Sequence, residues 1–321
     1  MLANQAPHPM AEQPTTDRQT VRLYWNHICI LHNYEKQYLA RLTERLAEQG
    51  IDLEVTFFGL GYATHMAEYL AQDDAVLPDM IVTADLEVVE HPRVAQKLTN
   101  RHACESWMAL KDTPAVRAVR RDETLLPVVV IPIVLYGADC TGEELGAIAR
   151  ERRLAFGGIN NSAGKTVTKA IWARYGCDEA DAVLQRSQVT DMPIGAFQAV
   201  RTGSAEVALV PSLYAMRSDG VTTHESAPAE GPLLLPSYLL ACETVPEEVA
   251  RTVARELLSS ELLGFYVTNG DLIACAAAIE PRSRYEDADP VWALDAVALA
   301  AIDVDELYDH YCAQLPTATR L

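Results

Sequence analysis

The sequence predicts an α/β protein built from two domains. Strand-like and helix-like segments alternate along most of the 321 residues, an order typical of parallel sheets covered by helices. Val, Ile, Leu and Ala are abundant whereas aromatic residues make up only 7% of the chain, which suits buried strands. Two extended apolar runs that contain proline, 125–137 and 231–242, enclose a block of about 100 residues, a usual size for one domain.

The first third of the chain predicts three strand–helix pairs. Apolar side chains from Tyr34 to Leu46 recur at helical spacing, and Gly50 suits the end of that helix. Because each strand is followed by a helix, we expect a parallel sheet with right-handed crossovers. The expected strands cover 21–30, 51–59 and 79–85, and the expected helices cover 34–46, 66–71 and 86–98.

The rest of the chain repeats this alternation. Pro193 suits the first position of a helix and Gly203 suits its end. Pro132 would interrupt the hydrogen bonds of a central strand, so we expect the run 125–137 to be a connecting strand at the margin of a sheet. Further strands are expected at 154–158, 187–192 and 205–211, and helices over 163–175, 193–202, 246–264 and 291–314.

The two proline-containing runs predict a discontinuous domain layout. After a disordered lead-in at 1–20, the chain is expected to build most of domain one, cross to domain two and cross back. Domain one is then 21–130 plus 237–321, and domain two is 131–236. Two crossings form a two-strand hinge, and a ligand would bind in the cleft between the carboxyl ends of the facing strands.

Charge and composition exclude several classes of protein. A formal net charge of −19 repels nucleic acids and anionic membranes, and no stretch approaches the roughly 18 consecutive apolar residues of a membrane span. The first residues lack the basic and apolar regions of an export signal. Seven cysteines occur without a CxxC pair, which favours free thiols in a reducing compartment. We therefore expect a cytoplasmic monomer, with an extracytoplasmic location as the alternative if the true start lies upstream.

The segment FGGINNSAGKTVTKAIW, 156–172, resembles a phosphate-binding P-loop at first sight. Such a loop needs a glycine that is separated by four residues from Gly164-Lys165-Thr166, and Ile159 stands there while Gly158 comes one residue too early. We therefore predict no ATP hydrolysis. Asn160, Asn161 and Ser162 are good N-cap types, so the segment predicts either an ordinary capped helix or a helix start that accepts an anionic or strongly polar ligand.

Five segments in this order resemble a known family. They are LPDMIVTAD, LPVVVIPIVLYG, LAFGGINNSAGKTVTKAI, GSAEVALVPSLYAM and EGPLLLPSYLLA. From Val21 to its C-terminus the chain resembles bacterial solute-binding proteins of ABC transporters, in the branch that binds iron(III), thiamine or polyamines. The resemblance implies the type II periplasmic-binding-protein fold, with two mixed sheets flanked by helices and a two-strand hinge. It also implies solute binding without covalent chemistry, and an ABC transporter permease as partner. Iron-binding relatives carry a tyrosine pair where this chain has only Tyr214, which weakens an iron site.

Four strand ends predict the ligand contacts of a small polar, anionic solute. Trp25 could cover an apolar face of the solute or be a core residue, while Asp85 could pair with an amine of the solute or cap the next helix. The main anchors are expected to be Asn26 and His27 in domain one and the helix start at Asn161 in domain two. The full predicted set is Trp25, Asn26, His27, Thr83, Asp85, Asn160, Asn161, Ser162, Gly164, Lys165, Ser212 and Tyr214.

A metal site and an enzyme are the alternatives that the sequence leaves open. His27, Cys29 and His32 lie close together, and imidazole with thiolate suits zinc. No fourth ligand is evident, so we expect no bound metal and no cofactor. The sequence lacks the common nucleophile, zinc-protease and dinucleotide motifs, so we expect no enzyme, although the fold also occurs in enzymes and in ligand sensors.

Overall fold

The computed structural model describes residues 18–59, 62, 64–294, 297 and 300–314. The predicted lead-in lies largely outside these residues, although Gln19 and Thr20 already belong to the first strand. The strands are β1 (Gln19–Asn26), β2 (Ile51–Phe58), β3 (Met80–Thr83), β4 (Leu126–Gly137), β5 (Leu154–Gly157), β6 (Gln188–Thr190), β7 (Val207–Pro211), β8 (His224–Ser226), β9 (Leu233–Ala241) and β10 (Ile273–Ala274).

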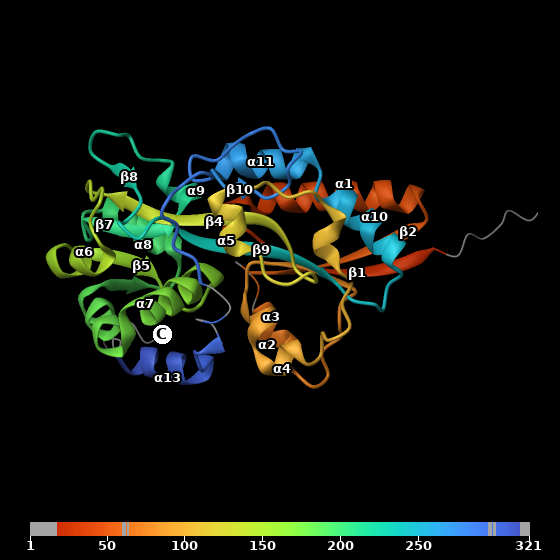
Figure 1. The fold of residues 1–321 in the computed structure, drawn as a ribbon, viewed down its shortest axis with the longest axis horizontal. Coiled ribbons are helices and arrows are strands. Elements are labelled where there is room, and N and C mark those ends of the chain that lie inside the picture. The colour runs from red at the N-terminus through yellow and green to blue at the C-terminus, as the bar shows by residue number, and fades with distance from the viewer. Residues whose placement is uncertain (1–17, 60–61, 63, 295–296, 298–299, 315–321) are drawn as a thin grey trace, which may run out of the picture.

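Helices surround these strands on both sides (Figure 1). They are α1 (His32–Glu48), α2 (Met66–Ala71), α3 (Glu87–Glu90), α4 (Pro92–Ala95), α5 (Pro114–Val119), α6 (Leu145–Glu151), α7 (Ser162–Arg186), α8 (Pro193–Arg201), α9 (Ser212–Ala215), α10 (Glu247–Leu257), α11 (Ser260–Gly270) and α13 (Val304–Gln314). Short 3-10 helices cover Cys29–Leu31 and Cys104–Trp107.

All ten strands join in one hydrogen-bonded sheet. Its main order is β2-β1-β3-β9-β4-β7-β5-β6, with β8 and β10 also paired to β4. The predicted parallel pairing of β1 with β2 and β3 is confirmed, and β5 is parallel to β6 and β7. Because β9 runs antiparallel to both β3 and β4, the sheet is mixed, and β4 and β9 connect its two halves.

The two connecting strands lie in the middle of the sheet. Every residue of β4 and β9 is buried, and the two strands pair from Leu126 opposite Leu239 to Ile133 opposite Leu233. Burial on both faces explains why these segments are continuously apolar rather than alternating. One cluster of buried apolar side chains extends from β1 and α1 through β4 and β9 to β5 and α7.

The expectation that the run 125–137 lies at a sheet margin is wrong. Pro132 lies in the central strand opposite Leu234, whose N–H donates to the Trp292 carbonyl instead of to β4. The backbone groups of Pro132 and Leu234 therefore point away from each other. On the far side of β4, β10 pairs only with residues 129–130, and the pairing with β7 begins at Ile133. A missing N–H at Pro132 costs no ladder hydrogen bond, because no neighbouring strand faces it there.

Several predicted helices differ in extent from the observed ones. The segment 86–98 divides at His91, which is extended before Pro92, the conformation that a following proline favours. The helix expected at 163–175 continues past a kink at Gly176 to Arg186. The segment 291–314 is not helical at its start, since Trp292 forms a bridge to Leu233 and α13 begins only at Val304.

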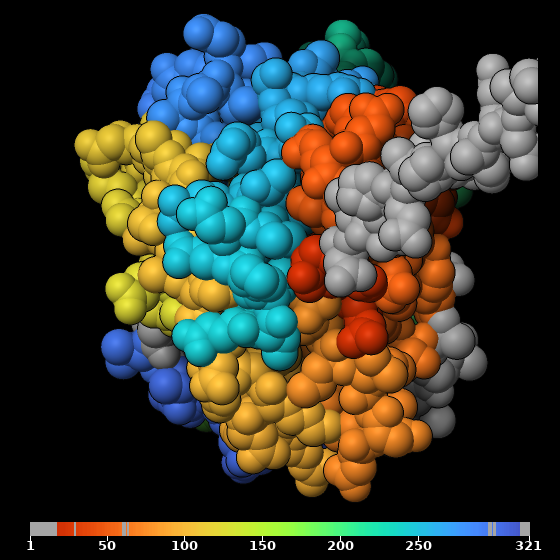
Figure 2. Space-filling model, turned by 90° about the vertical axis from the view of Figure 1, so that its right-hand side faces the viewer, coloured from red at the N-terminus to blue at the C-terminus, as the bar shows by residue number. Residues whose placement is uncertain are grey.

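The chain after β9 returns to the first half of the sheet. On the face shown in Figure 2, α10 (cyan) lies beside α1 (orange-red), and the Tyr38 hydroxyl donates to the Glu256 carbonyl at 2.6 Å. The predicted domain one also includes the last segment of the chain, but α13 packs against α7 in the other half (Figure 1). The predicted boundaries near residues 130 and 236 stay a prediction.

Among the described residues, no helix is both long enough and apolar enough to span a bilayer.

We predict that Gly164→Ala destabilises the protein. A Cβ atom at Gly164 would lie 1.7 Å from the Gly158 carbonyl oxygen and 2.5 Å from that of Gly157, so the start of α7 would have to move away from the end of β5. We expect a loss of about 1–3 kcal/mol or more in the free energy of unfolding, measured by urea denaturation.

Gly264→Ala in α11 is the matched control. Apart from the neighbouring backbone of α11, no atom of the described residues lies within 4 Å of a Cβ at Gly264, so alanine should be neutral or stabilise the helix by about 0.5–1 kcal/mol. Equal effects of the two substitutions would contradict the close contact described at Gly164.

Candidate functional site

A cavity of about 300 Å³ lies where the two halves of the sheet meet. The first half contributes strand-end residues after β1 and β3, the second half contributes the start of α7 and the end of β6, and the connecting strands form the floor. The lining residues are Asn26, His27, Ile28, Gly59, Tyr62, His65, Ala84, Ile131, Asn160, Asn161, Ser162, Ala163, Asp191, Met192, Pro211, Leu213 and Leu235.

His27 is held on the cavity wall by a buried carboxylate. Its Nδ1 lies 2.7 Å from Glu35 Oε2, and both side chains are completely buried. Glu35 also accepts hydrogen bonds from the Ile28 amide and the Tyr266 hydroxyl. A carboxylate with only donors around it is an acceptor, so Nδ1 carries the proton in this network.

The other ring nitrogen of His27, Nε2, differs from Nδ1 in its surroundings. Among the described residues nothing pairs with Nε2, although this atom is buried. A buried polar atom without a hydrogen bond is costly, and His27 lines the cavity. Nε2 accepts a hydrogen bond when the imidazole is neutral and donates one when it is protonated, so the atom is suited to contact a polar ligand.

Aromatic rings extend the same wall. The His27 ring stacks on Phe57 with centroids 4.8 Å apart and planes inclined by 8°, and Tyr62 lies 5.8 Å from His27. The ammonium group of Lys36 is 5.3 Å from the Tyr62 ring centroid, a distance typical of a cation–π contact. One side of the cavity therefore offers an aromatic face with a cation next to it.

The start of α7 forms the opposite wall. The Asn161 side chain caps the helix, since its Oδ1 accepts from the Gly164 amide at 2.9 Å and its Nδ2 donates to the Gly158 carbonyl at 2.9 Å. The amides of Ser162 and Ala163 have no acceptor among the described residues, and both residues line the cavity. Free amides at the positive end of a helix favour an anionic or oxygen-rich group.

An acidic residue lies close to this helix start. Asp191 follows β6 and lines the cavity, and its Oδ1 accepts a hydrogen bond from Asn160 Nδ2 at 2.5 Å. A ligand in the cavity would therefore meet two amides and one carboxylate within the second half of the protein.

The structure brings some of the predicted residues to the cavity and places others in the core. Asn26, His27, Asn160, Asn161 and Ser162 line the cavity. Trp25 is buried beside it without lining it, Ser212 donates to the Gly270 carbonyl at 2.8 Å, and Tyr214 packs against Phe197. Thr83 accepts from the Asp85 amide. The roles of the lining residues in ligand binding stay a prediction.

Lys165 does not reach the cavity but joins the two halves by ion pairs. Its Nζ lies 2.7 Å from Glu87 Oε2 and 3.5 Å from Asp85 Oδ2. Asp85 also accepts from the Glu87 amide, and its contact with a solute stays a prediction. The lysine of the Gly-Lys-Thr sequence is thus already paired, which leaves it unsuited to hold a nucleotide phosphate.

A buried polar network surrounds Glu87. Lys169, one turn after Lys165 on α7, lies 3.3 Å from Glu87 Oε1, and the Tyr308 hydroxyl of α13 donates to the same carboxylate. Burial acts to raise the pKa of Glu87, but the two ammonium groups and the tyrosine hydrogen bond outweigh it and lower the pKa. Glu87 therefore remains ionised within the protein.

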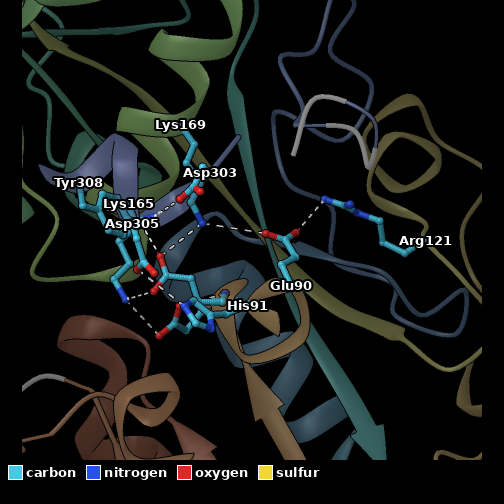
Figure 3. A network of polar contacts seen from close by, with 10 residues as sticks. Glu90, His91, Arg121, Lys165, Lys169, Asp303, Asp305 and Tyr308 are labelled. Atoms are coloured by element: carbon cyan, nitrogen blue, oxygen red, sulfur yellow. Dashed lines mark hydrogen bonds and ion pairs between the residues drawn. The ribbon is translucent and has the colours of Figure 1, made fainter. Parts of the chain in front are cut away.

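The pKa of Glu90 shifts in the opposite direction. Figure 3 shows it between Lys169, 4.0 Å away, and Arg121, 3.5 Å away. Burial raises the pKa of Glu90 to about 7, because these longer ion pairs only partly compensate and Glu87 repels a second negative charge. Glu90 thus titrates near neutral pH.

Some cavity residues were not predicted from the sequence. Asp191 follows a strand end just as Asn160 does, so the strand-end argument could have found it. Glu35 could not be identified as the partner of His27, because a buried carboxylate on an amphipathic helix has no distinguishing local pattern.

The His27, Cys29 and His32 cluster is only partly described. The two imidazole rings lie 5.9 Å apart, and Glu35 already pairs with His27 Nδ1. The side chain of Cys29 lies outside the described residues, so the expectation that no metal binds here stays a prediction. The other six cysteines are free thiols.

Comparison with known proteins decides the fold. The sequence matches no protein-family model, and a search of curated proteins found no match. The structure is similar to a Bordetella ferric binding protein (TM-score 0.64, 13% identity, 92% of this chain and 99% of that chain). It is also similar to the substrate binding protein of an ABC transporter from Agrobacterium tumefaciens (0.58, 11%, 91% and 95%).

The chain has the type II periplasmic-binding-protein fold. The predicted fold class is therefore confirmed, with the refinement that β4 and β9 join the two mixed sheets into one. A two-component system protein that mediates signal transduction has a similar structure (TM-score 0.63, 12% identity, 91% of this chain and 100% of that chain). At these sequence identities the structural similarity establishes only the fold, and the function has to be inferred from the candidate site.

We predict opposite effects of substitutions at the two glutamates. The pKa of Glu90 is raised from 4.5 to about 7, so between these values the folded state binds more protons than the unfolded state. The free energy of unfolding then falls as pH rises through this window. Glu90→Gln removes this loss, which amounts to at most about 3.5 kcal/mol over the full titration at about 1.4 kcal/mol per pKa unit.

Glu87→Gln is the matched comparison. Because the pKa of Glu87 is lowered in the folded protein, its ionised carboxylate stabilises the fold at pH values above the pKa of the unfolded state. Glu87→Gln should therefore lower the free energy of unfolding by about 3 kcal/mol or more at pH 8, since it leaves buried cations unpaired. Urea unfolding at pH 5 and pH 8 checks both variants. If Glu90→Gln leaves the pH slope unchanged, the described position of Glu90 is incorrect.

Proposed function

We propose that the protein binds a small polar solute in the cavity between its two halves, without covalent chemistry. The observation that carries this proposal is the buried, unpaired Nε2 of His27 on the cavity wall, opposite the free amides of Ser162 and Ala163. Each group requires a hydrogen-bonding partner, and the described residues do not provide one. A solute that bridges them satisfies both walls at once.

The solute of this proposal carries an anionic group. The α7 amides favour negative charge, and the cation of Lys36 lies over the Tyr62 ring beside the cavity. Asp191 on the same wall as the amides suits a hydrogen-bond donor elsewhere on the solute. A carboxylate or phosphate compound that also bears a hydroxyl or amino group matches this arrangement.

In this proposal the protein is the substrate-binding component of an ABC transporter. Support comes from the fold, which the chain shares with a transporter substrate-binding protein. This role requires the extracytoplasmic location that the sequence leaves as the alternative. The alternative is a ligand sensor, supported by the similar two-component system protein and by free thiols that suit a reducing compartment. Fractionation of the native host separates these two roles.

His27→Ala and Ser162→Pro should each weaken solute binding by about 10- to 150-fold, the equivalent of about 1.5–3 kcal/mol for one charge-assisted contact. Alanine removes the Nε2 contact. Proline at Ser162 removes one amide but suits the first position of a helix, and Asn161 before it is already extended. Native mass spectrometry of freshly purified protein identifies the solute, and calorimetry measures the affinity.

Ser260→Pro is the matched control, because Ser260 is also the first residue of a helix after an extended residue, and it lies in α11, outside the residues that line the cavity. Its affinity should equal that of the wild type. Gly164→Glu is unsuitable as a binding test, although it seems a natural choice from the sequence, because any Cβ atom at Gly164 meets the Gly158 carbonyl. Unchanged affinity in both cavity variants would place the site elsewhere.

Binding in the cavity should also draw the two halves together. We propose that two domains, 21–130 with 237–321 and 131–236, move relative to each other about β4 and β9. The helix α13 is the exception, because it packs on α7 and would move with domain two. A solute that contacts both halves binds the closed form better and shifts the population toward it. Small-angle scattering should show compaction of the wild type when the solute is added and none in His27→Ala, and compaction that persists in this variant would contradict the model.

A further inference from the structure

A second group of polar side chains lies at the junction of α7 and α13, away from the cavity. Cys177 and Asp181 belong to α7, and His310 belongs to α13. The Cys177 Sγ lies 3.7 Å from His310 Nε2, and Asp181 Oδ1 lies 2.8 Å from the same nitrogen. One ligand atom from each residue falls within 4.8 Å of the other two.

The local structure explains why these three side chains converge. Gly176 adopts φ 74°, which interrupts α7 so that a new helical segment starts at Cys177. Cys177 and Asp181 are four residues apart and therefore lie on one face of this segment. The rings of Trp172 and His310 lie edge to face with centroids 5.0 Å apart, and Gln185 donates to Gln314 at 2.9 Å further along the two helices.

Two of the three distances between the ligand atoms are close to those around a bound metal. A thiolate, an imidazole and a carboxylate around tetrahedral zinc would stand about 3.3–3.5 Å from one another, given metal–ligand bonds of about 2.0–2.3 Å. The observed Sγ–Nε2 distance is slightly longer and the Nε2–Oδ1 distance slightly shorter. The Cys177 thiol and the Asp181 carboxylate are the more distant pair, since the three ligand atoms span up to 4.8 Å. These two side chains therefore have to rotate toward each other to hold an ion, and the exposure of Cys177 gives the ion access.

We propose that Cys177, Asp181 and His310 form a Zn²⁺ site that clamps the C-terminal helix onto α7. Thiolate and imidazole together favour zinc over magnesium or calcium, and the fourth position is filled by water. The sequence alone predicts no metal, because no fourth ligand is evident near His27, Cys29 and His32. The structure brings His310 to Cys177 across 133 residues.

The site acts on the position of α13 rather than on the cavity. Tyr308 lies two residues before His310 on this helix and donates to Glu87 of the first half. Zn²⁺ at the site would therefore hold the segment that carries one of the polar contacts between the halves. None of the three ligands lines the solute cavity, so the two sites can be tested separately.

Titration of the reduced full-length protein with Co²⁺, which replaces Zn²⁺ and reports thiolate ligation by its charge-transfer absorption, tests the proposal. We expect one equivalent of Co²⁺ with this absorption, displaced by Zn²⁺. Cys177→Ser should abolish the absorption, and His310→Ala should weaken binding by at least about 100-fold, since even second-shell losses reach that size. Cys312→Ser is the matched control, because Cys312 is also exposed but lies on α13. This variant should bind Co²⁺ as the wild type does.

A second measurement separates this site from the histidine cluster near the cavity. Zn²⁺ should raise the thermal unfolding midpoint of the wild type, Cys312→Ser and His27→Ala, but not of Cys177→Ser. Absence of Co²⁺ binding by the wild type would overturn the proposal. An absorption that survives in Cys177→Ser, or that is lost in His27→Ala instead, would overturn it as well.

Discussion

The antiparallel pairing of β4 with β9 is the constraint on which the rest of the structure depends. These two strands are the central members of the sheet, and all their residues are buried. On one side they are extended by β3, β1 and β2, and on the other by β7, β5 and β6. Because both halves share this pair, the strand ends of each half face the other across one cavity.

The polar contacts between the halves limit how they can move. Lys165 and Lys169 of α7 meet Glu87 across the junction, and Tyr308 adds a hydrogen bond from the C-terminal helix. Buried ion pairs contribute little net stability, but breaking one leaves a costly unpaired charge. The network therefore favours one relative position of the halves, and any opening has to hydrate these charges together.

Much of the fold could be predicted from the sequence because its causes are local. The apolar strands and the cap residues before α7 are recognisable from residue type and spacing, as Asn161 shows. Pro132 misled the prediction, because the absence of a neighbouring strand at that position depends on β7 and β10, which are far away in the chain. The candidate site follows the same rule. His27 could be predicted from its strand end, whereas the partners of Lys165 and Cys177 come from other parts of the chain.

The central claim is that one solute bridges His27 and the start of α7, and a crystal structure of the protein with its co-purified solute tests it most directly. The account predicts solute atoms at hydrogen-bonding distance, about 2.7–3.2 Å, from His27 Nε2 and from the amide of Ser162 or Ala163. Solute bound elsewhere, with only water between these groups, would contradict it.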